Sequence, residues 1–200
     1  MEIRYSAGIT SKLFWGVEAK KTACFVLDGL CKNEIKDIII RENIYQALNE
    51  ERSRRMFGYI YNRVTSLGEG LIRMLTKANS DDVKVINMVS ILFTERLIFE
   101  FMYEIYRQKI MLGDLYFVDK DFNNFFEAKK IQSDEVASWT ETTQMKIRQT
   151  ILKMLVEGGF IQIDEKGNRI ITRPIISYKI EEYLKNNGLQ DYLNAMTGEK

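Results

Sequence analysis

Residues 133–173 read SDEVASWTETTQMKIRQTILKMLVEGGFIQIDEKGNRIITR, and this stretch decides the fold class. A hydroxyl at Ser133, followed by two acidic residues, predicts the N-terminal cap of a short helix that ends at Trp139. Thr140 then predicts the cap of a longer helix that runs to Glu157, where a Gly-Gly pair supplies the left-handed residue that ends many helices. Two short apolar segments around a turn come next, and they predict a β-hairpin.

A further helix is expected just upstream, over residues 121–130, with aromatic side chains facing inward. These aromatic residues are Phe122, Phe125 and Phe126. The hairpin strands are expected at 160–163 and 169–173, and Pro174 follows where no ladder donor is needed. Three helices followed by a hairpin are typical of a winged helix-turn-helix, whose last helix enters the DNA major groove.

The long helix of this module has two faces. Ile147, Ile151 and Leu155 recur at helical spacing and are expected in the core, together with Leu152 and Val156. The opposite stripe is polar, and its amide, hydroxyl and cationic groups can face base edges and phosphates. We therefore predict DNA contacts from Thr142, Thr143, Lys146, Gln149 and Lys153 in the helix and from Lys166, Arg169 and Arg173 in the wing.

The charge of this module leaves other functions open. Residues 118–180 hold ten basic and nine acidic side chains, and Asp164 and Glu165 at the hairpin tip oppose phosphate binding. A polar stripe on a surface helix is most often only solvated, and many winged helices bind proteins instead. Docking of another protein is therefore the alternative function. Regulation of transcription from the protein's own operon is a second alternative.

Helical patterns also fill the first part of the chain. Met56, Ile60, Val64 and Leu67 form a single apolar stripe, which is typical of a helix buried on one side. The expected helices lie over 12–29, from Asn33 with a break near Glu42-Asn43, over 51–67, over 70–77, and from Ser80 to Leu112 with a bend near Thr94-Glu95. This part of the chain is expected to form a helical bundle.

We therefore predict a mostly α protein with two parts. A helical domain spans residues 1–115, and a winged-helix domain with a C-terminal helix spans 116–200. A short strand over 115–118 is expected near the boundary. Because no Pro-, Gly- or Ser-rich linker separates the two halves, they are expected to pack closely.

A row of arginines in the helical half is a secondary candidate patch for phosphate or an acidic partner. Its members are Arg52, Arg54, Arg55 and Arg63. Because Glu50 and Glu51 adjoin the row, a solvated face with local ion pairs is the favoured interpretation.

The composition excludes several chemistries. The 200 residues hold 29 basic and 28 acidic side chains, no His and two Cys. Without His there is no Ser-His-Asp triad, no Cys-His dyad and no His metal ligand, and two Cys are too few for a zinc ribbon or an iron–sulfur cluster. The known phosphate-binding loops and the nucleophile elbow are also missing. We expect no enzyme, no metal site and no cofactor.

No apolar run approaches the roughly 20 residues that a membrane span needs. The N-terminus also lacks the apolar region of a secretory signal. Cys24 and Cys31 lie seven residues apart, which places them on one helix face rather than in a disulfide. We expect a cytoplasmic protein without a membrane partner.

Short motifs along the chain carry a family resemblance. They are Tyr5-Ser6-Ala7-Gly8-Ile9-Thr10 with Phe14-Trp15, then Arg96-Leu97-Ile98-Phe99-Glu100-Phe101, then Trp139-Thr140-Glu141-Thr142-Thr143 leading into Leu155-Val156-Glu157-Gly158-Gly159. In these motifs the chain resembles the BrxA family of BREX phage-defence systems. The resemblance implies a helical bundle, a C-terminal winged helix, binding of double-stranded DNA, no known catalytic activity and action alongside other BREX components. It transfers no site residue.

The sequence hypothesis is a non-enzymatic DNA-binding accessory protein with little or modest sequence specificity. Its partners are double-stranded DNA and other BREX components, and the sequence does not define the oligomeric state. We expect Lys146→Glu combined with Arg169→Glu to remove most of the DNA affinity and leave the fold intact.

Overall fold

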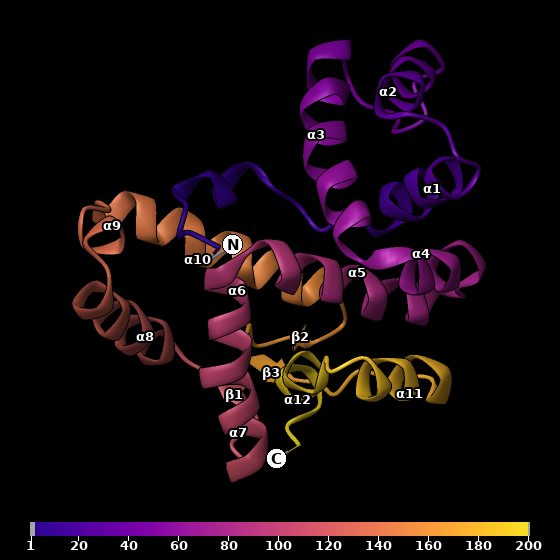
Figure 1. Ribbon diagram of the computed structural model, residues 1–200. Helices are drawn as coiled ribbons and strands as arrows, with labels where there is room; N and C mark the ends of the chain where they lie inside the picture. The colour runs from indigo at the N-terminus through magenta and orange to yellow at the C-terminus, as the bar shows by residue number, and fades with distance from the viewer. Residues whose placement is uncertain (1–2, 200) are drawn as a thin grey trace. The chain divides into compact units, whose positions relative to one another are not determined.

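A computed structural model describes residues 3–199 and is mostly helical (Figure 1), which confirms the expected mostly α fold class. The chain forms two compact units. One is Trp15–Thr94, called the helical unit below; the other, called the mixed unit, combines the chain up to Phe14 with the chain from Glu95 onward. The boundary predicted between residues 115 and 116 falls inside the mixed unit. As a division between independently folding parts, it stays a prediction.

The helical unit consists of five helices. They are α1 (Gly16–Leu27), α2 (Lys32–Arg41), α3 (Glu50–Ser66), α4 (Gly68–Lys77) and α5 (Ser80–Thr94). The predicted apolar stripe of α3 is buried from Met56 to Leu67. The breaks predicted near Glu42-Asn43 and near Thr94-Glu95 are confirmed, because α2 ends at Arg41 and α5 ends at Thr94.

The expected helix over 12–29 is wrong at its start. A 3-10 helix, η1 (Ala7–Ser11), occupies the preceding segment, and Trp15 holds a left-handed backbone with φ 51° before α1 begins. The expectation that Cys24 and Cys31 share one helix face is also wrong. The chain turns at Gly29 (φ 81°), so Cys24 lies in α1 and Cys31 caps the N-terminus of α2.

The mixed unit contains the remaining helices and a small sheet. Its elements after η1 are α6 (Arg96–Phe101), the π-helical turn η2 (Met102–Tyr106), α7 (Arg107–Leu112), β1 (Tyr116–Phe117), α8 (Asp119–Gln132), α9 (Asp134–Ala137), α10 (Glu141–Glu157), β2 (Ile161–Ile163), β3 (Arg169–Ile171), α11 (Tyr178–Asn186) and α12 (Gln190–Thr197). The single C-terminal helix expected from the sequence is therefore two helices. The chain breaks between them at Gly188, which has φ 71°.

The sheet has the order β1-β3-β2, and both pairings are antiparallel. The expected hairpin is β2 with β3, in which Ile163 lies opposite Arg169. Its turn is built on Asp164, whose carboxylate accepts hydrogen bonds from the backbone N–H groups of Lys166 and Asn168. The expected strand over 115–118 is present as β1, and it pairs with β3, so the central strand is the last one in sequence.

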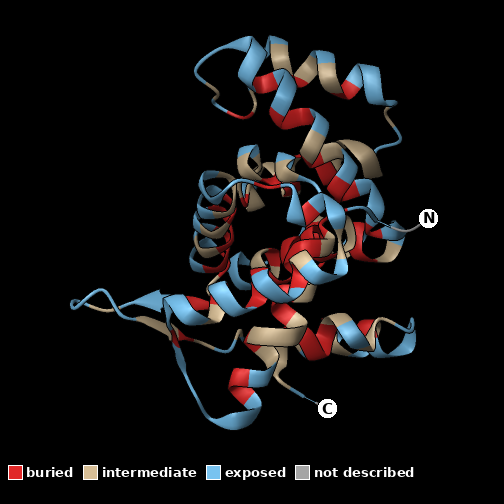
Figure 2. Cartoon of the chain, turned by 90° about the vertical axis from the view of Figure 1, so that its left-hand side faces the viewer, coloured by how far each residue is buried: buried red, intermediate tan, exposed pale blue. Residues whose placement is uncertain are grey.

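An aromatic cluster holds α8 against the sheet and α6. The ring of Phe101 lies 4.7 Å from that of Phe122, 5.3 Å from that of Phe125 and 5.6 Å from that of Phe117, measured between centroids. The inward placement predicted for the phenylalanines of α8 is confirmed. Figure 2 shows the buried residues concentrated on the inner faces of the helices.

The N-terminal segment of the mixed unit packs against α10 through η1, where Ile9 is almost fully buried. Phe14 lies beside Gly158, where a Cβ would be 3.1 Å from a Phe14 ring carbon. The hydroxyl of Tyr5 donates to Glu100, which also receives bonds from Arg96 and Lys129. The N-terminal segment therefore packs against α10 through η1 and Phe14 and helps to hold that helix in place.

Candidate nucleic-acid interface

Helix α10 begins and ends where its sequence predicts. The hydroxyl of Thr140 accepts a hydrogen bond from the backbone N–H of Thr143, which satisfies one of the free donors of the first turn. The helix ends at Glu157, and Gly159 takes the left-handed conformation at φ 78°. The same capping operates at α9, where Ser133 accepts from the N–H of Val136.

The apolar face of α10 faces the core as expected. Ile147, Ile151 and Leu155 are fully buried. Val156 does not belong to that face. It follows Leu155 in the last turn of α10, so its side chain points to a different side of the helix and is 38% exposed. Leu152 is half-buried. The expected core placement is therefore wrong for Val156.

The polar face of α10 is exposed to solvent at the four stripe positions predicted from the sequence. These are Thr142, Lys146, Gln149 and Lys153. Within residues 3–199, neither Lys146 nor Lys153 has an ion-pair partner. Thr143 is half-buried, and its hydroxyl lies 3.0 Å from that of Thr140, so this side chain belongs to the helix cap. The structure thus brings four of the five helix residues together on one open face.

The three predicted wing residues have different surroundings. Lys166 lies exposed in the hairpin turn, and Arg173 is exposed just beyond β3. Arg169 is in β3, and its Nη1 donates to Oδ1 of Asp119 at 2.8 Å. Lys166 and Arg173 are open to a phosphate, whereas Arg169 is engaged with a carboxylate.

Asp119, the first residue of α8, also accepts a hydrogen bond from Arg148 of α10. The hydrogen bond from Arg169, assisted by the positive charge of Arg148, holds the pKa of the Asp119 carboxyl below its usual range. This three-residue cluster was not predicted from the sequence. No local pattern could have found it, because Asp119 and Arg169 are 50 residues apart in the chain.

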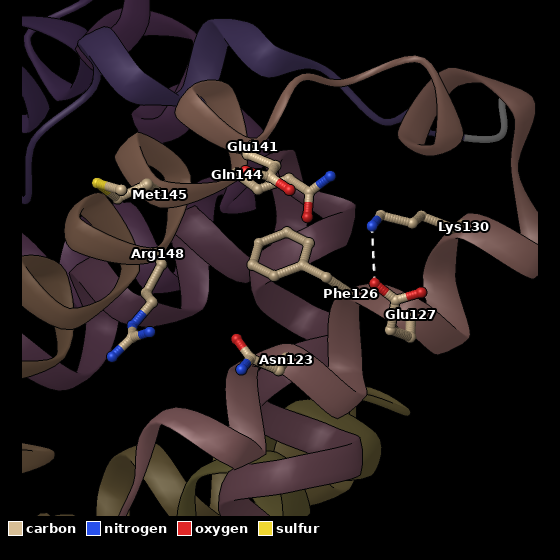
Figure 3. Close-up of a pocket in the computed structure, with 8 residues that line it drawn as sticks. All are labelled: Asn123, Phe126, Glu127, Lys130, Glu141, Gln144, Met145 and Arg148. Atoms are coloured by element: carbon tan, nitrogen blue, oxygen red, sulfur yellow. Dashed lines mark hydrogen bonds and ion pairs between the residues drawn. The ribbon is translucent and has the colours of Figure 1, made fainter.

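A hollow of about 300 Å³ lies between α8 and the first turns of α10 (Figure 3). Its lining residues are Asn123, Phe126, Glu127, Lys130, Glu141, Gln144, Met145 and Arg148. Phe126 lies in the middle of this group, and Glu127 pairs with Lys130 at 2.7 Å. The hollow therefore combines an apolar floor with charges of both signs at its rim.

The secondary arginine patch is not a continuous exposed surface. Arg54 pairs with Glu50 at 3.2 Å, and Arg55 lies 4.0 Å from Glu51, as the favoured interpretation expected. Arg63 is only 2% exposed, so its inclusion in a surface patch is wrong. It is buried because its position on α3 faces the interior of the helical unit.

The guanidinium of Arg63 lies 5.8 Å from the ring of Trp15, and that ring stacks on Tyr59 at 6.3 Å. Arg52 remains exposed. The four arginines therefore divide into three on the surface and one that packs inside the helical unit.

Between residues 3 and 199, no three His, Cys, Asp or Glu side chains come together in a way that suits a metal ion. In the same part of the chain, every helix is too short or too polar to span a lipid bilayer.

Comparisons with known proteins agree with one another. The family model described as BrxA matches residues 3–188. A protein of Bacillus cereus named BREX protein BrxA is 34% identical over 98% of this chain and 97% of its own length. A protein of the same name from Paramagnetospirillum magneticum is 22% identical and covers 94% of each chain.

The fold has a counterpart among solved structures. The crystal structure of an uncharacterized protein from Magnetospirillum magneticum superposes with a TM-score of 0.83, at 21% identity, over 98% of this chain and 100% of that one. At this level of identity the likeness concerns the fold alone. The family match and the curated relatives show that the chain belongs to the BrxA family.

Proposed function

We propose that this protein is a non-enzymatic accessory protein of a BREX phage-defence system that binds double-stranded DNA through a winged helix. Helices α8, α9 and α10, followed by the β2–β3 hairpin, have the element order of that module. The single observation that carries the proposal is the exposed polar face of α10, with two lysines that have no ion-pair partner among residues 3–199.

The chemistry of this face suits a duplex. Gln149 can bond to base edges in the major groove, and Lys146 can reach guanine or phosphate oxygens. Lys166 and Arg173 add phosphate contacts from the hairpin and the segment after it. Because the net charge of the chain is only +1, affinity depends on this local arrangement and falls steeply with salt.

The partners follow from the family. Two curated relatives carry the name BREX protein BrxA, so we assign this protein to a BREX system and expect other BREX components as partners. We expect it to act in the cytoplasm, where the DNA that it binds lies. The function includes no catalytic step.

Docking of another protein is the second candidate function, and the hollow between α8 and α10 favours it. Phe126 and Met145 give the hollow an apolar surface beside the polar face of α10. Met145 is 59% exposed, so its side chain is accessible to a partner protein beside Phe126. If this function holds, Met145→Glu will abolish co-purification with another BREX component.

The deciding experiment is fluorescence anisotropy with labelled duplexes, comparing random sequence with the sequence upstream of the operon at several salt concentrations. The proposal expects similar affinity for both and a straight log–log salt plot, with a slope of about 0.9 per phosphate neutralised. Absence of binding at low salt would contradict it and leave the docking function. Strong preference for the upstream sequence would indicate a transcriptional regulator.

A further inference from the structure

Two arginines from different elements meet at one exposed carboxylate. Arg148 of α10 and Arg169 of β3 both donate to the same oxygen, Oδ1 of Asp119. The side chain of Asp119 is 67% exposed, whereas those of Arg148 and Arg169 are only 20% and 28% exposed. The carboxylate is therefore the outer member of the cluster, and it covers two cations that are held further in.

Each arginine is positioned by contacts other than Asp119. The guanidinium of Arg148 lies 5.1 Å from the centre of the Phe122 ring, and that ring is fully buried. Arg169 is in the central strand of the sheet, between Phe117 of β1 and Ile163 of β2. The strand pairing fixes the backbone of Arg169, and the Phe122 ring packs against the guanidinium of Arg148, so both arginines stay at this site when the carboxylate moves away.

The pair suits a phosphate diester. A guanidinium has five N–H donors in a planar fork, and each of these two gives one of them to Asp119 within the described residues. A phosphate diester carries the same single negative charge as Asp119 and accepts such forks in the same way. The exposed carboxylate makes weak ion pairs, because water screens them, so replacing it costs little.

We infer that Arg148 and Arg169 form a phosphate-binding pair that Asp119 occupies in the free protein and leaves when a DNA backbone phosphate enters. This inference rests on the proposed DNA binding and deepens it. It adds Arg148, which lies outside the predicted polar stripe, to the interface. It also makes Asp119 a residue that weakens DNA binding, because its carboxylate competes with phosphate for the two arginines.

The test is Asp119→Asn in the full-length protein, measured by anisotropy with a random duplex. The amide oxygen still accepts from both guanidiniums, so only the negative charge is removed. We expect affinity to rise about fivefold near 0.1 M salt, because the phosphate no longer has to displace a charged carboxylate from the two arginines.

Glu127→Gln is the matched control. Glu127 lies on the same helix, its side chain is 69% exposed, and it also pairs with a cation, Lys130. The Glu127→Gln variant measures how much affinity rises when any exposed negative charge is removed, so a larger rise in Asp119→Asn is due to the two arginines. The combination Arg148→Gln with Arg169→Gln provides the second control, because Asp119→Asn is expected to give no gain in that background. Thermal melts check that each variant folds, and Arg169→Gln alone replaces the combination if the latter is unstable.

The possible outcomes distinguish failure of the phosphate-binding pair from failure of the proposed DNA binding. If wild type binds DNA but Asp119→Asn gains no more than Glu127→Gln, the phosphate pair is wrong and the proposed function stands. A gain that survives loss of the arginines also overturns the pair. If wild type binds no duplex even at low salt, the proposed function fails and this inference fails with it.

Discussion

Helices α3 and α10 have the same length, 17 residues, and both begin with a side-chain cap, Asn49 in one and Thr140 in the other. They differ in how their cations are placed. On α3, Arg54 and Arg55 lie one turn after Glu50 and Glu51 and pair with them. On α10, Lys146 and Lys153 have no such partner in the described chain.

The difference shows that counting basic residues does not identify an anion site. On α3, Arg54 and Arg55 each face a glutamate of their own, so these pairs add no net charge for a phosphate, whereas a cation without a carboxylate nearby offers its full charge. The helix dipole also stabilises Glu50 and Glu51, because negative charges in the first turn of a helix lie at its positive end. Position relative to acidic neighbours therefore distinguishes the two helices.

The largest expected effect is on stability, from the buried cation of α3. We expect Arg63→Ala to lower the free energy of unfolding by about 3 kcal/mol, because it empties space beside Trp15 and removes a well-packed stem. Urea unfolding followed by circular dichroism measures this. Arg52→Ala on the exposed side of the helix is the control, with a change within about 0.5 kcal/mol. Equal, small losses for both variants would show that Arg63 has no structural role.

The next effect concerns DNA and tests α10 directly. Lys146→Glu with Lys153→Glu is expected to weaken duplex binding roughly thirtyfold, equivalent to about 2 kcal/mol, and to flatten the salt slope. Stability is expected to stay the same because both side chains are exposed. The charge-matched control on α3 is Arg52→Glu with Arg54→Glu, for which we expect less than about a threefold loss. A similar loss in both pairs would mean that net charge alone governs binding.

Acid is expected to weaken the unit that contains α10 through Glu100. Burial acts to raise the pKa of Glu100, but hydrogen bonds from Arg96, Lys129 and Tyr5 outweigh it and hold the pKa below its usual range. Ionised Glu100 therefore contributes stability above its unfolded pKa, and this contribution is lost as pH falls through the lower folded value. Glu100→Gln is expected to show a smaller drop in unfolding free energy between about pH 6 and about pH 3 than wild type.

Hydrogen exchange at both pH values locates that effect. Protection is expected to fall in the mixed unit, where Glu100 lies, more than in α3. A uniform loss across both helices, or an unchanged pH dependence in Glu100→Gln, would contradict the assignment to Glu100.

The smallest expected effect comes from releasing an arginine on α3. Glu50→Gln breaks the pair with Arg54 and is expected to cost about 0.3–0.5 kcal/mol of stability. DNA affinity is expected to change by less than about twofold, because the released cation lies on α3, far along the chain from α10 and the β2–β3 hairpin. A larger gain in affinity would bring α3 into the interface and remove the contrast with α10.

Several features of the fold could be predicted from short stretches of sequence. Thr140 and Ser133 cap their helices because a hydroxyl bonds to an N–H only three residues away. The buried face of α10 follows from apolar residues at helical spacing, and the hairpin turn follows from the residues within it. Gly188, after two asparagines, is also a typical helix stop, although a single last helix was predicted over this region.

Burial and charge neutralisation could not be predicted in the same way. In the sequence Arg63 looks like Arg54 and Arg55, a basic residue expected at the surface. Only the packing of α1 against α3 shows that its side chain is buried. Arg169 carried the signal of a wing cation, and only the return of the chain to β1 and α8 brings Asp119 beside it.

The sequence alone determined the helical class, the limits of α10 and its exposed polar stripe, because caps, periodicity and turns act over a few residues. The tertiary structure decided which cations are available to a ligand. That property depends on carboxylates and aromatic rings contributed by distant segments, such as Asp119 beside Arg169 and Trp15 beside Arg63. A charge interacts through space with whatever the fold places near it, and the order of residues along the chain does not record that neighbourhood.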